Sequence, residues 1–188
     1  MATDENDRCL AAPGELEIVR DFVNTRDPKK GTDRIDRPER LSSWLVERGL
    51  LTDAPRISEE EVERIHAFRE ALRAMLLANA GFLLSGEATA AFNAATDSVR
   101  LGVRAEDAGR FTLLPSGDGF DRVIGRLLSA IFTAQENGTW GRLKACAECH
   151  WALYDHTKNR SAAWCDTAKC GTKVRSRRYR ERRRRTLA

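Results

Sequence analysis

The stretch that decides the fold is CAECHWALYDHTKNRSAAWCDTAKC, residues 146–170, which holds four of the five cysteines in the chain. These cysteines are spaced as Cys-x2-Cys, then fifteen residues, then Cys-x4-Cys. Two thiolates a few residues apart can bind one side of a tetrahedral ion, and a chain that folds back brings the second pair to the other side. The spacing therefore predicts one structural zinc ion per chain. Its ligands are Cys146, Cys149, Cys165 and Cys170.

Other uses of these cysteines are a disulfide pair, a redox or iron–sulfur role, and burial as small apolar side chains. Clustering within one short stretch argues against scattered core use, since the remaining cysteine is Cys9. The N-terminal sequence MATDENDRCL lacks the apolar segment of a secretory signal, which predicts a cytoplasmic protein. A reducing cytoplasm favours metal binding over a disulfide. His150 and His156 are further candidate ligands, but four cysteines complete a tetrahedral shell without them.

Basic residues dominate the C-terminal end. The segment GTKVRSRRYRERRRRTLA, residues 171–188, has nine Lys or Arg and a single acid. Residues 140–188 carry 14 basic and 4 acidic residues, a net charge of +10, whereas residues 1–139 carry 18 and 24, a net charge of −6. Such an asymmetry is typical of a protein that binds a polyanion.

A basic helix after the last cysteine can lie in the major groove of DNA, where phosphate contacts position it and arginines read guanine edges. From Arg182 onward, however, an arginine run is also typical of a disordered, solvated tail. The candidate contacts are Lys173, Arg175, Arg177, Arg178 and Arg180, with Lys158 and Arg160 from the turn between the cysteine pairs.

Residues 146–184 resemble the CGNR zinc finger, a C-terminal module of bacterial transcription regulators. The matching features are the Cys-x2-Cys, Tyr154-Asp155, Trp164-Cys165 and Cys170-Gly171. The tetrad that gives the module its name is here CGTK, because Thr172 and Lys173 replace Asn-Arg. Lysine keeps the charge but lacks the planar fork of arginine, whereas threonine can still cap a helix.

The segment ELEIVRDFVNT, residues 15–25, resembles the opening of the ABATE domain, which members of this family join to the finger. Together the two resemblances imply a zinc-dependent, DNA-binding transcription regulator. In it, the N-terminal domain would sense a small-molecule effector or mediate assembly, for instance as a homodimer.

The hydrophobic pattern predicts an α+β fold with two domains. Residues 1–138 form a mostly helical domain, with helices expected over 15–25, 38–49, 58–76, 87–96 and 120–137 and one antiparallel hairpin over 99–104 and 111–114. Ser58 and Glu61 form a capping box for the longest helix. Residues 139–188 form a zinc-binding domain, a zinc hairpin followed by the basic helix. Because its aromatic core is thin, we expect this domain to unfold without metal while the first stays folded.

Three residues of the first domain are candidate ligand contacts. Asn24 ends the first helix, where a polar side chain also serves simply to bond the helix end or the next loop. Arg69 and Arg73 lie one turn apart beside an apolar face and could hold an anion. Solvated salt bridges are the alternative for both arginines.

We expect no enzyme activity. Four thiolates leave zinc no open position for water or substrate, and the chain has no recognisable nucleotide-binding loop, paired carboxylates or Ser-His-Asp set. The longest nearly apolar run, residues 74–84, is too short to span a bilayer, so no membrane partner is expected. The alternative function is an RNA- or ribosome-associated protein, since the same charges bind any phosphate backbone.

Overall fold

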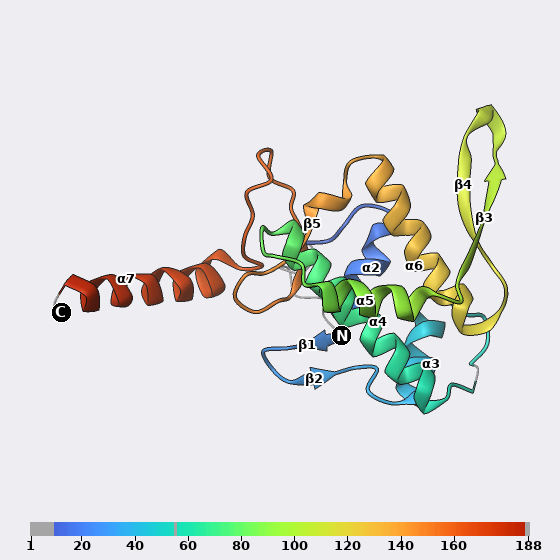
Figure 1. Cartoon of the computed structure of the whole chain (residues 1–188), viewed down its shortest axis with the longest axis horizontal. Coiled ribbons are helices and arrows are strands. Elements are labelled where there is room, and N and C mark those ends of the chain that lie inside the picture. Colours follow the sequence, from blue (N-terminus) through green and yellow to red (C-terminus); the bar gives the residue numbers. More distant parts are fainter. Residues whose placement is uncertain (1–9, 55, 187–188) are drawn as a thin grey trace.

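The computed structural model describes residues 10–54 and 56–186, so Cys9 lies outside the described part of the chain. Within that part there are six α-helices and three two-stranded antiparallel sheets, which confirms the predicted α+β class (Figure 1). The helices are α2 (Leu16–Val23), α3 (Pro38–Glu47), α4 (Glu59–Asn79), α5 (Gly86–Thr96), α6 (Gly119–Glu136) and α7 (Thr172–Thr186). The paired strands are β1 (Arg26–Asp27) with β2 (Thr32–Asp33), β3 (Arg100–Ala105) with β4 (Phe111–Ser116), and β5 (Leu143–Ala145) with β6 (Ala152–Tyr154).

Helix α4 is the centre of the body. It begins at the predicted capping box, in which the Ser58 side chain accepts a hydrogen bond from the Glu61 amide at 3.1 Å and Glu61 accepts one from the Ser58 amide at 2.7 Å. Its apolar side chains are buried against α2, with the rings of Phe68 and Phe22 5.8 Å apart. Burial of such a stripe is what holds an amphipathic helix in place.

The β3–β4 hairpin is covered only at its base. A side chain at Gly125 of α6 would come within 2.7 Å of Pro115 Cβ, so the close approach of helix and hairpin requires glycine. Pro115 lies inside β4, opposite Leu101, and not beyond the strand as expected; β4 is an edge strand, where proline is tolerated. The tip of the hairpin projects from the body, and Val103 and Phe111 are 70% and 74% exposed (Figure 1).

The main hydrophobic core continues past residue 138 into the β5–β6 hairpin. Leu143, Ala145, Ala152 and Tyr154 are buried in the same cluster as the apolar faces of α2, α4 and α6. The expectation of a thin core of its own is therefore wrong for most of the hairpin, because the body covers it. A second small cluster, with Leu153, Cys146 and Cys170 buried and Trp164 packed against them, forms the core around the cysteines. The domain boundary at 138–139 itself stays a prediction.

Candidate metal centre and nucleic-acid interface

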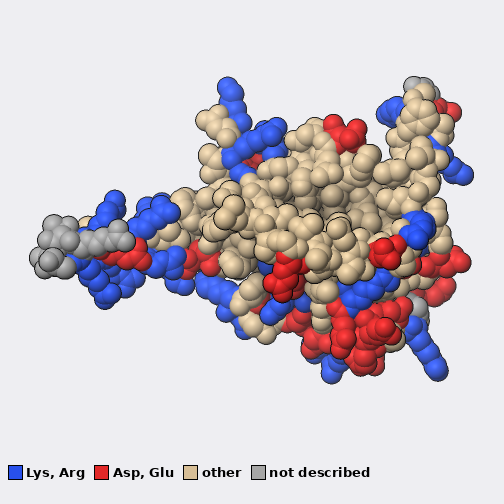
Figure 2. Space-filling model, in the orientation of Figure 1, with Lys and Arg blue, Asp and Glu red and all other residues tan. Residues whose placement is uncertain are grey.

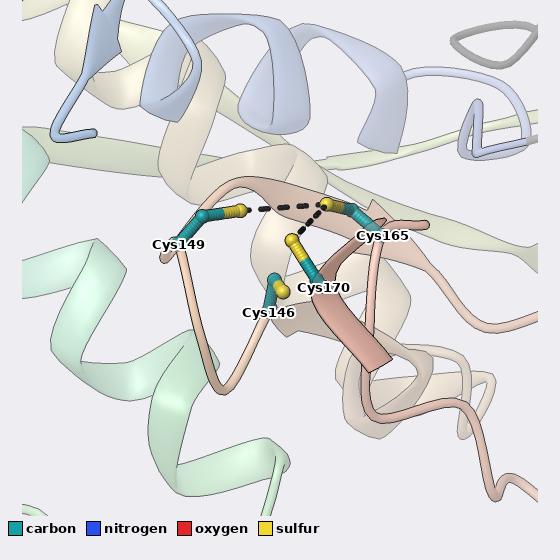
Figure 3. Close-up of side chains that lie close together, drawn as sticks. All are labelled: Cys146, Cys149, Cys165 and Cys170. Carbon is teal, nitrogen blue, oxygen red and sulfur yellow. Dashed lines mark hydrogen bonds between the residues drawn. The ribbon is translucent and has the colours of Figure 1, made fainter. Parts of the chain in front are cut away.

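Two turns of the backbone bring the four cysteines together (Figure 3). Cys146 and Cys149 lie in the turn between β5 and β6, Cys165 ends the loop that follows β6, and Cys170 lies in a short π-helical turn, η3 (Thr167–Gly171), that leads into α7. The amide of Ala147 donates to the carbonyl of Ala163 at 3.1 Å, which holds the second pair beside the first.

The sulfur atoms are arranged as a tetrahedral metal site requires. All four lie within 4.8 Å of one another, with Cys149 Sγ 3.4 Å from Cys165 Sγ and Cys165 Sγ 3.8 Å from Cys170 Sγ. Zinc–sulfur bonds of about 2.3 Å in a regular tetrahedron place the sulfurs ~3.8 Å apart. The four cysteines are free thiols, and these separations are far longer than the roughly 2.05 Å of a disulfide. The geometry therefore fits a metal ion, and zinc is the ion that a four-sulfur shell favours.

Close packing of the sulfurs also shifts their acidity. The pKa of Cys149 is raised to about 12 and that of Cys165 is raised further, because each thiol hydrogen-bonds to the sulfur of Cys146. In turn, these hydrogen bonds lower the pKa of Cys146. Four thiolates this close repel one another unless a cation replaces the protons, which is the condition that zinc would satisfy.

The two histidines of the stretch are not part of the sulfur cluster. His150 has a φ of 61°, and its amide donates to the Cys146 carbonyl at 2.9 Å, so it closes the turn that carries Cys149. The ring of His156 forms a 2.8 Å hydrogen bond with the carbonyl of Ala11. Both residues thus have roles in the local fold.

Asp155 organises the loop between the two cysteine pairs. Its buried carboxylate accepts hydrogen bonds from the side chain of Lys144 at 2.7 Å, the hydroxyl of Thr157 at 2.6 Å and the amide of Ala162 at 2.9 Å. Burial alone would raise its pKa, but these hydrogen bonds lower it to about 2, so the group is charged at neutral pH. This explains why an aspartate follows Tyr154 at the end of β6.

Helix α7 is fastened to the metal site at its first turns. Val174 is buried, and Gly171 packs against the ring of Trp164 next to Cys165. Glu148, between the first two cysteines, bonds Lys173 at 2.9 Å and Arg177 at 2.8 Å. Tyr179, further along α7, is 57% exposed and does not pack the helix against the body. Beyond these contacts α7 extends away from the body (Figure 1).

The candidate nucleic-acid contacts lie on the surface, as Figure 2 shows for the end of the molecule that carries α7. Arg175 bonds Thr172 at 3.2 Å, whereas Arg178 and Arg180 are exposed along α7. Lys158 and Arg160 are exposed on the loop that Asp155 holds, and Arg160 has a φ of 53°. The fold therefore presents cations from two segments on either side of the second cysteine pair. Contact of these residues with a nucleic acid stays a prediction.

The three candidate ligand contacts of the body are buried, with Asn24, Arg69 and Arg73 3%, 1% and 4% exposed. Arg69 bonds both carboxylate oxygens of Asp33, at 2.8 and 2.5 Å, and the hydroxyl of Thr25 at 2.9 Å. The alternative of solvated salt bridges is therefore wrong for both arginines. In the structure, the side chains of these three residues donate hydrogen bonds to other groups of the protein. A ligand role for them stays a prediction.

Asn24 and Arg73 join the body to the metal site. Asn24 donates to the carbonyl of Ala152 in β6 at 2.9 Å and accepts from the amide of Ala152 at 2.8 Å. Arg73 donates to the carbonyl of His150 at 2.7 Å and to that of Val23 at 2.6 Å. These contacts, and that of Glu148 with α7, were missed from sequence. One sequence signal could have indicated the contact of Glu148 with α7, namely an acid inside the Cys-x2-Cys turn followed by a basic helix.

Four cysteines placed to hold one metal ion are the defining feature of many zinc-finger proteins, and residues 142–183 match the family model described as CGNR zinc finger. Residues 16–152 match ABATE, described as "Putative stress-induced transcription regulator", and since this match spans most of the chain, the protein belongs to the ABATE family. The ABATE match includes β5 and ends at Ala152, the first residue of β6, so it extends into the hairpin that shares the core of the body. No curated protein matches the chain. Among the described helices, none is long and apolar enough to cross a membrane.

Proposed function

We propose that this protein is a zinc-dependent transcription regulator whose finger and α7 bind duplex DNA, acting in the cytoplasm. The observation that carries the proposal is the link from Glu148 to Lys173 and Arg177, at 2.9 and 2.8 Å. It ties the basic helix to the turn that holds two of the cysteines. A helix fixed in this way presents its arginines in defined directions, which a solvated tail does not.

The charges of α7 suit a phosphate backbone. Arg175, Arg178 and Arg180 point into solvent over successive turns, and arginine forms two parallel hydrogen bonds with phosphate or with a guanine edge. Lys158 and Arg160 add cations from a separate loop. Zinc bound by the four cysteines would supply a structural crosslink. It would have no open coordination position, so we propose no catalytic role for it.

Salt dependence of binding tests the proposal. Neutralising about six phosphates predicts a slope of roughly −5 in a plot of log K against log salt for duplex DNA. Arg177→Ala combined with Arg178→Ala should make this slope shallower by about 2 and leave zinc content unchanged. Selection from random duplexes should enrich a sequence that survives competitor DNA.

The alternative, an RNA- or ribosome-associated protein, uses the same cations. If the selection enriches no duplex sequence and the protein binds folded RNA tightly, the RNA alternative is favoured and the DNA proposal is contradicted. In either case the body would serve assembly, for instance as a homodimer, or the binding of a small-molecule effector.

A further inference from the structure

The turn between β1 and β2 displays two lysines that the proposed function does not use. Asp27 accepts hydrogen bonds from the amides of Lys29 at 2.9 Å and Lys30 at 3.1 Å, and Gly31 closes the turn with a φ of 69°. The backbone of the turn is thus held from inside, while both lysine side chains are exposed and that of Lys30 is 76% exposed.

This turn is linked to the metal site through a single guanidinium. Arg73 donates to the carbonyl of Arg26, in β1, at 3.1 Å and to the carbonyl of His150, next to Cys149, at 2.7 Å. The β1–β2 hairpin projects toward the end of the molecule from which α7 leaves (Figure 1). Since Glu148 lies in the same cysteine turn as His150 and holds Lys173 and Arg177, the hairpin and the start of α7 both adjoin that turn.

The acids around the hairpin are already occupied. Asp33 is paired with Arg69 at 2.5 Å, and Glu70 with Arg73 at 3.0 Å. Asp27 holds the turn amides and lies 3.6 Å from the ammonium of Lys30, and because the Lys30 side chain is 76% exposed this ion pair contributes little. Both ammonium groups can therefore turn to an external anion without leaving a buried carboxylate unpaired.

We infer that the β1–β2 turn is a second phosphate-binding element, through which the ABATE body contacts the nucleic acid held by α7. The inference rests on the proposed function and deepens it. Lys29 and Lys30 bind the phosphodiester backbone, so they contribute affinity and register, and the reading of bases remains with the arginines of α7.

The test compares two double variants of the full zinc-loaded chain in the duplex-binding assay. Lys29→Ala with Lys30→Ala removes two charges from the turn. Arg104→Ala with Arg110→Ala removes two from the exposed β3–β4 hairpin, at the opposite end of the molecule from α7 (Figure 1). We expect the lysine pair to weaken binding at least tenfold at about 0.1 M salt and to make the slope shallower by about 2. The arginine pair should change the slope by less than about 0.5, and both variants should keep their zinc.

Equal weakening by the two double variants would overturn the inference, because net charge alone would then explain the loss. So would an unchanged slope in the lysine variant. If Arg177→Ala with Arg178→Ala weakens binding and the lysine variant does not, the proposed function stands and the inference is wrong. Failure of the unaltered protein to bind any nucleic acid would overturn both.

Discussion

The guanidinium of Arg73 donates a 2.7 Å hydrogen bond to the carbonyl oxygen of His150, which lies 77 positions further along the chain. It joins the longest helix of the body to the turn that holds Cys146 and Cys149. The same side chain bonds the carbonyl of Val23 at 2.6 Å and the carboxylate of Glu70 at 3.0 Å. One buried cation thus holds α4, the end of α2 and the metal site in a fixed arrangement, so the stability of the body and retention of zinc should be coupled.

Replacing Arg73 should test this coupling. Arg73→Ala removes the donor to the carbonyls of Val23 and His150 and one of the ion pairs of Glu70, which should cost about 3–5 kcal/mol in the free energy of unfolding. Zinc should also pass to a competing chelator faster than from the unaltered protein. Arg64→Ala is the matched control, because Arg64 lies on the same helix but bonds Ala95 and Asp121, away from the cysteines. Equal rates of zinc transfer from the two variants would contradict the coupling.

Removal of zinc should loosen only part of the C-terminal region. Without zinc the cysteines would take up protons and the crosslink between the two cysteine pairs would be lost, so residues 164–171 and α7 should exchange amide hydrogens faster. Strands β5 and β6 should stay protected, because Asn24 and Arg73 bond the hairpin and most of its buried apolar side chains lie in the main core. Hydrogen exchange with and without chelator measures this. Complete loss of protection in β5 and β6 would show that the hairpin depends on the metal, as the sequence alone led us to expect.

Glu148 should restrain nucleic-acid binding as well as position α7. Its pKa is lowered, chiefly by the hydrogen bond from Lys173, so it is charged at neutral pH. This negative charge lies 2.9 Å from Lys173 and 2.8 Å from Arg177 and offsets part of their attraction for phosphate. Glu148→Gln should therefore raise affinity for duplexes of arbitrary sequence about fivefold. Glu106→Gln, on the β3–β4 hairpin, makes the same change in net charge and should have a much smaller effect. Weaker binding by the Glu148 variant would show that positioning outweighs repulsion.

The Asp33–Arg69 pair should give the body a stability that depends on pH. Burial alone would raise the pKa of Asp33, but the hydrogen bonds from Arg69 and from the Ile35 amide hold it below its ordinary value of 3.8. Because the folded pKa is the lower one, the carboxylate stabilises the native state above about pH 4, and this contribution is lost as the pH falls below that value. Asp33→Asn should cost about 3 kcal/mol at pH 7, and the difference from the unaltered protein should shrink below pH 4.

Urea unfolding over this pH range provides the measurement. Asp36→Asn is the control, since Asp36 pairs with Arg40 at 3.2 Å on the surface, and a surface pair is worth about 0–1 kcal/mol. A difference between Asp33→Asn and the unaltered protein that stays constant as the pH falls would show that hydrogen-bond geometry, and not charge, carries the stabilisation.

Much of the fold and the cysteine cluster could be predicted from sequence, because they depend on local patterns. The capping box at Ser58 and the spacing of Cys146 and Cys149 each involve residues a few positions apart. Asn24 and Arg73 could not be assigned in this way, since their partners lie 128 and 77 positions away. A polar side chain near a helix end has many local ways to be satisfied, and hydrophobic periodicity carries no information about which distant carbonyl it will meet.

We propose that one zinc ion, bound by the four cysteines, fixes the basic helix in a position to bind nucleic acid. The metal content of the purified protein is the most direct test of this proposal. The purified protein should contain one zinc per chain, and Cys165→Ser should lose both the zinc and tight duplex binding while the body stays folded. Protein without stoichiometric metal, or a Cys165→Ser variant that binds duplex as tightly as the unaltered chain, would contradict the account.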